Sequence, residues 1–227
     1  MARNLCATIL VILFAAGATL AQASADDYFN RAVDRQKEGD LAGALADYTK
    51  AIEIDPQDAD ALNNRGNVRK TMGDLAGALK DFDAAIAADP TSPTAYINRG
   101  VVKKIKGDLD GAIADYSVAI ERAPSNTSAY YNRGTARREK GDFARAESDL
   151  SKVIAANPRH ARALVARGRT FMELGNAEQS VLDLSRALTI DPFLADAYKY
   201  RAVAYRTQKK PALALADEKR AVELAKK

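Results

Sequence analysis

The feature that most constrains this chain is a repeat of 34 residues that runs through almost all of it. Prolines and glycines recur at this step: Pro56, Pro90, Pro124, Pro158 and Pro192, and Gly39, Gly73, Gly107, Gly141 and Gly175. A period of about 20 to 50 residues is typical of stacked supersecondary units. The register defines six copies: 25–58, 59–92, 93–126, 127–160, 161–194 and 195–227.

Each copy is predicted to form two helices joined by a tight turn. In the third copy, Ser92 offers an N-cap for a helix over 93–106, with proline at its first position. Gly107 can adopt the left-handed conformation that ends this helix, and Asp108 can cap a second helix over 109–122. A two-residue turn folds the pair antiparallel. The second helix has an apolar stripe at three- and four-residue spacing: Leu109, Ile113, Tyr116 and Ile120.

The unit resembles the tetratricopeptide repeat family, whose signature is a large residue, a small one, then Ala, an aromatic, Ala and Pro. The second and third copies carry it as Leu62, Gly66, Ala78, Phe82, Ala85 and Pro90, and as Tyr96, Gly100, Ala112, Tyr116, Ala119 and Pro124. The resemblance covers residues 25–227. It implies an all-α fold, a right-handed α-solenoid of six helix-turn-helix repeats, whose concave face, lined by each first helix, binds other proteins.

The last copies depart from this signature. The aromatic of the second helix becomes Leu150, Leu184 and finally Glu218, Ser180 replaces the first alanine of the fifth copy, and Lys209-Lys210-Pro211 replaces Gly-Asp-Leu. A terminal repeat has no neighbour to cover its outer face, so Glu218 and Lys219 suit a solvated cap. An incompletely covered last helix is a candidate homodimer contact.

Residues 1–25 have the three parts of a secretory signal peptide. Arg3 is the only charge before Asp26, residues 5–21 are an uncharged apolar run, and small residues follow. Cleavage fits after either Ala23 or Ala25. The alternative is an uncleaved anchor helix, although such a helix usually needs about 20 apolar residues. We predict an exported protein, most consistent with the periplasm, with no membrane span after cleavage.

Composition excludes several classes of function. Lys and Arg number 34 against 30 Asp and Glu, with no dense block of one sign, which is too weak a bias for a nucleic-acid-binding protein. One Cys and one His remove an internal disulfide and most metal sites. His160 is expected in a surface turn, and Asp108–Gly111 is better explained as a helix cap than as a calcium loop. No nucleophile or phosphate-loop motif occurs. We therefore predict no catalytic site, no metal and no cofactor.

An arginine recurs in every copy at a position where the family usually has an apolar residue facing the interior. An aspartate follows each arginine by 16 residues, giving Arg31, Arg65, Arg99, Arg133, Arg167 and Arg201 with Asp47, Asp81, Asp115, Asp149, Asp183 and Asp217. A half-buried arginine needs a partner, because leaving it unpaired costs several kcal/mol (about 3–5). We predict structural ion pairs, either within each hairpin or between one aspartate and the arginine of the next repeat. The alternative is that these arginines bind an acidic ligand.

A row of asparagines lies one residue before four of these arginines: Asn30, Asn64, Asn98 and Asn132. Some family members hold an extended peptide with such a row, because amides both donate and accept hydrogen bonds. Alternatively, these amides bond a neighbouring helix. Six residues further on lie Gln36, Lys70, Lys104 and Arg138, three of them cations, and Phe29, Ile97 and Tyr131 add apolar surface. These cations could also be an ordinary solvated face.

Together these features predict a non-catalytic scaffold that binds an extended, partly acidic protein segment in a concave groove outside the cytoplasm. The predicted groove residues are Asn30, Asn64, Asn98, Asn132, Lys70, Lys104, Arg138 and Tyr131. Assembly of an envelope complex is one use for such a scaffold. The alternative is a self-assembling structural subunit that uses its exposed terminal repeats.

Overall fold

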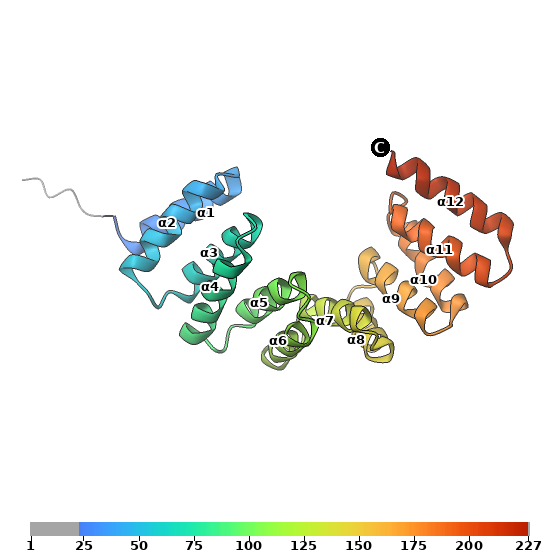
Figure 1. Ribbon diagram of the computed structural model, residues 1–227, viewed down its shortest axis with the longest axis horizontal. Coiled ribbons are helices and arrows are strands. Elements are labelled where there is room, and N and C mark those ends of the chain that lie inside the picture. The colour runs from blue at the N-terminus through green and yellow to red at the C-terminus, as the bar shows by residue number, and fades with distance from the viewer. Residues whose placement is uncertain (1–22, 227) are drawn as a thin grey trace, which may run out of the picture.

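The computed structural model describes residues 23–226, which form twelve α-helices in six antiparallel pairs (Figure 1). The helices are α1 (Ala25–Glu38), α2 (Leu41–Ile54), α3 (Ala59–Thr71), α4 (Leu75–Ala88), α5 (Pro93–Ile105), α6 (Leu109–Arg122), α7 (Thr127–Lys140), α8 (Phe143–Ala156), α9 (Ala161–Glu173), α10 (Ala177–Ile190), α11 (Ala195–Thr207) and α12 (Pro211–Ala225). The predicted all-α array of six helix pairs is confirmed. Residues 1–22, on which most of the predicted signal peptide falls, lie outside the described residues.

The turn within each pair is set by local chemistry. Glycine takes a left-handed φ of 76–88° at the first five turns, and Lys209 takes φ 59° at the sixth. Asp108 caps α6, since its carboxylate accepts the Gly111 N–H at 2.9 Å. The prediction for Ser92 was wrong in part: Ser92 occupies the N-cap of α5, but its side chain makes no capping hydrogen bond. The helix also ends one residue earlier than predicted, with Lys106 as its C-cap.

The two helices of a pair cross closely because one of them lacks a side chain at the crossing. A Cβ atom on Gly100 would lie 2.7 Å from the Tyr116 ring, and one on Gly66 would lie equally close to Phe82. These distances are far shorter than van der Waals contact. Tyr116 and Phe82 are fully buried as a result.

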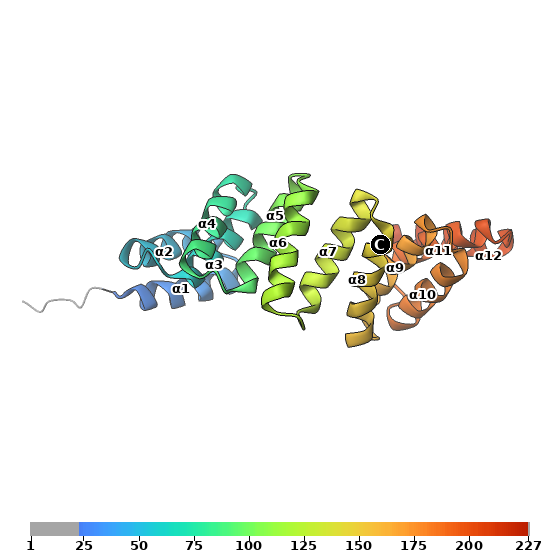
Figure 2. The ribbon, with the colours of Figure 1, turned by 90° about the horizontal axis from the view of Figure 1, so that it is seen from below.

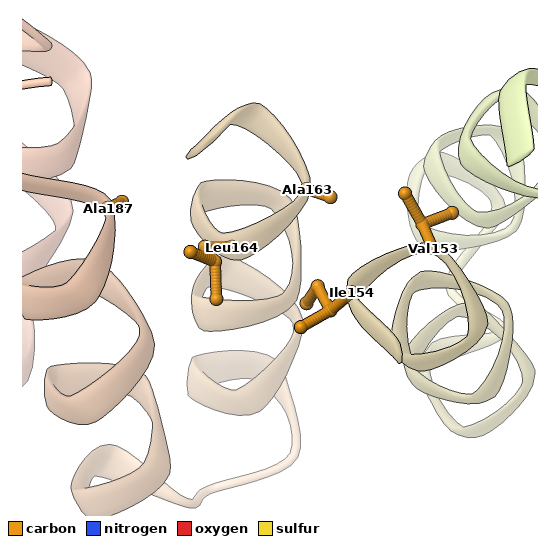
Figure 3. Close-up of a cluster of buried hydrophobic side chains, with 5 residues drawn as sticks. All are labelled: Val153, Ile154, Ala163, Leu164 and Ala187. Atoms are coloured by element: carbon orange, nitrogen blue, oxygen red, sulfur yellow. The ribbon is translucent and has the colours of Figure 1, made fainter. Parts of the chain in front are cut away.

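Neighbouring pairs stack through small apolar clusters. Figure 3 shows one of them, in which Val153 and Ile154 of α8 meet Ala163 and Leu164 of α9, with Ala187 of α10 on the far side. Similar clusters recur along the chain, so each pair depends mainly on its neighbours for its core.

The array is curved. The first helices of successive pairs contact one another from α3 to α11, whereas no two second helices make comparable contact within the described residues. The first helices therefore lie on the inner side of the curve. In Figure 1 the two ends of the array rise on the same side, and Figure 2 shows the pairs following one another along the long axis.

An arginine–aspartate pair lies between the two helices of every hairpin. The arginine donates two hydrogen bonds, from Nε and Nη2, to the two carboxylate oxygens of the aspartate 16 residues later, at 2.6–3.0 Å. All six aspartates are buried. Of the two arrangements considered from the sequence, the structure has the pairs within each hairpin.

The same arginines also link one repeat to the one before it. Their remaining nitrogen, Nη1, donates to a side chain two residues after the preceding aspartate, and the acceptors are Thr49, Asp83, Ser117, Ser151 and Ser185. Arg31 has no preceding repeat among the described residues, and its side chain is 51% exposed, against 13–19% for the other five.

Four of the aspartates bind a second cation from the first helix at less than 3 Å, which sequence reasoning missed. It lies 12 residues before the aspartate, at 2.7–2.9 Å, and is Arg35, Arg69, Lys103 or Arg137. In the last two repeats the equivalent residues are Phe171 and Tyr205, and the guanidinium of Arg167 or Arg201 lies 5.5–5.7 Å from the ring centroid. This distance is in the range of cation–π contact.

Candidate functional site

The inner curve of the array has a cavity of about 350 Å³. It is lined by side chains of α5, α7, α9 and the start of α11: Lys104, Tyr131, Thr135, Arg138, Glu139, Arg162, Val165, Ala166, Arg169, Leu194 and Asp196. Because these are first helices of four successive repeats, the cavity lies on the concave face. Three of the predicted groove residues, Lys104, Tyr131 and Arg138, are among its walls.

The arginines of this cavity have no anionic partner. Arg138, Arg162 and Arg169 form no ion pair with any residue of 23–226, and Nε of Arg138 is buried without a hydrogen-bond partner. Burial lowers the pKa of Arg138, and the nearby charge of Arg169 lowers it further, whereas the opposing effects of Glu139 and Glu173 are smaller. Buried polar groups in folded proteins are normally hydrogen-bonded, so Arg138 has hydrogen-bonding capacity that the described residues do not satisfy.

The fourth cation of the cavity is already neutralised. Nζ of Lys104 lies 2.9 Å from a carboxylate oxygen of Glu139 and donates to Thr135 Oγ1 at 3.3 Å. Further along the groove, the half-buried Lys70 donates to Asn67 of its own helix, and burial lowers its pKa. The predicted basic stripe is thus uneven: Lys104 is paired with a carboxylate, whereas Lys70 and Arg138 have no ion pair among the described residues.

Apolar and aromatic groups form the remaining walls. Tyr131 stacks on His160, with ring centroids 5.4 Å apart, and the guanidinium of Arg169 lies 4.1 Å above the Tyr200 ring. Val165 and Leu194 pack against the buried cluster of Figure 3 while still lining the cavity. The expectation that His160 lies in a simple surface turn was incomplete. His160 is the N-cap of α9, and its Nδ1 accepts the Ala163 N–H.

The predicted asparagine row is only partly available to a ligand. Asn98 donates to the side-chain oxygen of Asn63 at 2.9 Å, which is the bond to a neighbouring helix considered above. Asn64 lines a second, smaller concavity of about 270 Å³, near Gln36 and Tyr48. Asn30 is exposed and Asn132 half-buried, and neither side chain is hydrogen-bonded to another described residue.

The arginine–aspartate pairs lie away from the cavity, between the helices of each hairpin. Their charges are satisfied by the pairs already described, which makes them a feature of the framework. The cavity arginines Arg162 and Arg169 were missed from the sequence. Arg169 lies three residues after Ala166, the fifth-repeat equivalent of the asparagines, and residues three apart share a helix face. A helical projection that included this position would have identified Arg169 as a groove residue.

Two features were not found in the described region. Residues 23–226 contain no cluster of three or more His, Cys, Asp or Glu side chains that could hold a metal ion. No helix in this range has the length and apolar character required to cross a membrane.

Comparison with known families identifies the class of protein. A model described as "TPR repeat" matches residues 36–73, and one described as "Tetratricopeptide repeat" matches residues 64–127 and 131–195. The chain therefore belongs to the tetratricopeptide repeat family, whose members are generally non-catalytic scaffolds for protein–protein interaction. A search of curated proteins by sequence found no match.

Several solved structures share the fold. PilW, a "widely conserved type IV pilus biogenesis factor", is 20% identical with a TM-score of 0.78, over 86% of this chain and 90% of PilW. YrrB, "a TPR protein with an unusual peptide-binding site", is 24% identical with a TM-score of 0.67, over 78% and 91% of the two chains. MamA is 23% identical with a TM-score of 0.66, over 71% and 94%. At these identities the similarity shows the fold alone.

Proposed function

We propose that this protein is a non-catalytic scaffold that holds an extended, partly acidic segment of another protein along its concave groove. The observation that carries the proposal is the contrast between two sets of arginines. Those between the helices are paired with carboxylates, whereas Arg138, Arg162 and Arg169 face a cavity in the groove without partners. Unpaired cations beside apolar walls suit a ligand that brings its own carboxylates.

The groove also offers contacts for a peptide backbone. Asn64 lines the second concavity, and Asn132 has a side chain without a hydrogen-bond partner among the described residues. A segment that crosses both concavities would run along the inner curve from α3 to α11. The peptide-binding site named for YrrB supports this use of the fold.

The adjacent tyrosines Tyr130 and Tyr131 allow a matched test. Tyr131 lines the groove cavity, whereas Tyr130 lines a separate hollow beside Pro124 and Lys152. A photo-crosslinking phenylalanine analogue is placed at either position, and the protein is irradiated in an envelope extract. We expect adducts from position 131 and few from position 130. The Asn64→Ala/Asn132→Ala double variant should weaken capture at 131. Equal capture from both positions, or none from 131, would contradict the proposal.

We further propose export to the periplasm, on the basis of the signal-peptide features of residues 1–25. Cleavage after Ala23 is supported by the cap of α1. The Ser24 hydroxyl accepts the Asp27 N–H at 3.1 Å, and the Asp27 carboxylate accepts the Ser24 N–H at 2.9 Å. Cleavage after Ala25 would remove this cap. The pilus role named for PilW makes assembly of an envelope complex a reasonable setting.

The processing proposal is tested by the mass of the mature chain. Cell fractionation of the full-length protein should place it in the periplasm, and its N-terminal residue should be Ser24. The Ser24→Ala variant should lose about 1 kcal/mol of stability. A cytoplasmic, uncleaved chain would contradict export, and a chain that starts at Asp26 would contradict the chosen frame.

The second candidate is a self-assembling structural subunit, which the open face of α12 favours. Leu215 and Val222 are 66% and 55% exposed there, whereas Ile120, Ile154 and Leu188, the equivalents of Val222 in earlier repeats, are buried. Glu218 on this helix pairs with Arg206 at 2.7 Å. Particle growth with concentration in light scattering, abolished by Leu215→Lys, would favour assembly over the groove function. A constant particle size would exclude it.

A further inference from the structure

The groove cavity has an excess of positive charge that its own residues do not neutralise. Four cations line it, Lys104, Arg138, Arg162 and Arg169, against the two carboxylates of Glu139 and Asp196. Glu139 is held by Lys104. Asp196 forms no ion pair with any described residue, so its charge offsets at most one of the three free arginines.

The arginines are also arranged to recognise planar anions at close range. The guanidinium carbon of Arg169 lies 4.1 Å from the centroid of the Tyr200 ring, a cation–π contact that restrains the side chain, and Arg169 forms no ion pair with any described residue. Arg138 is held from α7 with its Nε buried, and Arg162 enters from the first turn of α9. A guanidinium presents its N–H donors in a fixed fork that matches a carboxylate.

The walls beside these arginines accept an apolar side chain. Val165, Leu194 and Tyr131 contribute apolar surface, and all three are anchored by the core cluster between α8, α9 and α10. A cavity of about 350 Å³ is large enough for two or three side chains of a peptide and too small for a folded element.

From this geometry we propose that the cavity is an anchor site for two neighbouring carboxylates and an adjacent apolar side chain within one peptide segment. The inference rests on the proposed groove function and specifies it. One carboxylate is bound by Arg138 and Arg169, the other by Arg162, and the apolar side chain lies on Val165 and Leu194. The predicted Lys70, in another part of the groove, is outside this site.

The probes are fluorescent peptides with both ends blocked and flexible Gly-Ser flanks around a central Glu-Glu-Leu. Blocked ends remove any contribution from a terminal carboxylate. Matched peptides carry Gln-Gln-Leu, Glu-Glu-Ser, or a single phosphoserine with Leu, and a fifth has Glu-Glu-Leu with a free C-terminus. Affinities are measured by fluorescence anisotropy at constant ionic strength, because charged contacts are screened by salt.

We expect Glu-Glu-Leu to bind about tenfold or more tightly than Gln-Gln-Leu, since each lost charge-assisted hydrogen bond weakens binding by roughly that factor. Glu-Glu-Ser should bind several-fold more weakly than Glu-Glu-Leu. The variants Arg138→Gln and Arg169→Gln should each reduce the preference for Glu over Gln several-fold. Lys70→Gln, a groove cation outside the cavity, should change the affinity less than about twofold.

Four results would overturn the inference. They are equal binding of the Glu and Gln peptides, an equal effect of Lys70→Gln and Arg138→Gln, tight binding of the phosphoserine peptide alone, and binding that needs the free C-terminus. Circular dichroism and thermal unfolding of each variant confirm that the fold is intact. If the peptides fail but crosslinking from Tyr131 succeeds, only the anchor site is wrong. If both fail, the groove function is wrong as well.

Discussion

The first four repeats and the last two stabilise the same buried aspartate in different ways. In repeats one to four the aspartate binds two cations, as Asp149 binds Arg133 and Arg137. In repeats five and six an aromatic ring replaces that second cation, as Phe171 does beside Arg167. Besides Arg167, Asp183 has among the described residues only the half-exposed Arg186, at 3.7 Å. The aspartate recurs in all six repeats, but the positive charge that surrounds it differs between the first four repeats and the last two. The consequence of removing the aspartate should differ accordingly.

The largest expected effect tests this inequality directly. Asp149→Ala leaves two mostly buried cations facing each other and should destabilise the protein by about 3–5 kcal/mol. Asp183→Ala leaves one mostly buried arginine, Arg167, beside a ring, because Arg186 is half-exposed and 3.7 Å from the carboxylate, so the effect of this variant should fall at or below the lower end of that range. Urea unfolding of both variants gives the comparison. Asp149→Asn, which keeps the shape, serves as the control. An equal or reversed order would refute the contrast between the two regions.

A second experiment gives repeat four the aromatic residue that repeat five has at the position of Arg137. Arg137→Ala removes a mostly buried charged hydrogen bond to Asp149 and should cost about 1.5–3 kcal/mol. Arg137→Phe should be milder by about 0.5–1 kcal/mol, because a ring can contact Arg133 as Phe171 contacts Arg167. Chemical denaturation measures both. If Arg137→Phe is less stable than Arg137→Ala, an aromatic ring cannot replace the second cation and the proposed equivalence is wrong.

The pH dependence of stability sharpens the comparison in the first repeat. Hydrogen bonds from Arg31, with the charges of Arg31 and Arg35, hold the pKa of Asp47 below its usual range, despite the opposing effect of burial. A lowered folded-state pKa contributes stability above the unfolded-state pKa of about 3.9, and this stability is lost as the pH falls through the folded value. Wild type should lose stability below about pH 4. Asp47→Asn should lose less over the same interval, so the two unfolding free energies should converge. Parallel profiles would show that Asp47 is not responsible.

The smallest expected effect concerns the turns of the same two regions. Glycine takes the left-handed conformation in the first five hairpins, and Lys209 takes it in the last. A non-glycine residue there is strained by about 1 kcal/mol, partly offset by the greater freedom of glycine in the unfolded chain. Lys209→Gly should therefore slow hydrogen exchange in α11 and α12 by an amount that corresponds to about 0.5 kcal/mol. Faster exchange would show that the turn is not strained.

Much of the fold could be predicted because its signals are local and periodic. Proline, glycine and capping aspartate mark most helix boundaries, and the spacing of 16 residues places Arg99 and Asp115 about equally far from the turn of their hairpin. Whether an arginine binds the aspartate of its own hairpin depends on how the repeats rotate against one another. The sequence does not encode this rotation in any single residue.

The candidate site was less predictable for the same reason. The cavity forms where α5, α7, α9 and α11 converge, so its walls come from residues up to three repeats apart. The sequence indicated Lys104 and Arg138 as equivalent cations. Only the three-dimensional arrangement separates Lys104, which is neutralised by Glu139, from Arg138, which is not.

The arginine links between repeats have a consequence for how long such an array can become. Every internal junction joins an arginine to a hydroxyl or carboxylate, ending with Arg201 on Ser185. The next residue in this series, 34 positions later, is Lys219. A second molecule added end to end in the same register would place its Arg31 against that lysine. Like charges would then replace a hydrogen bond, so docking of α1 of one molecule on α12 of another in this register is disfavoured.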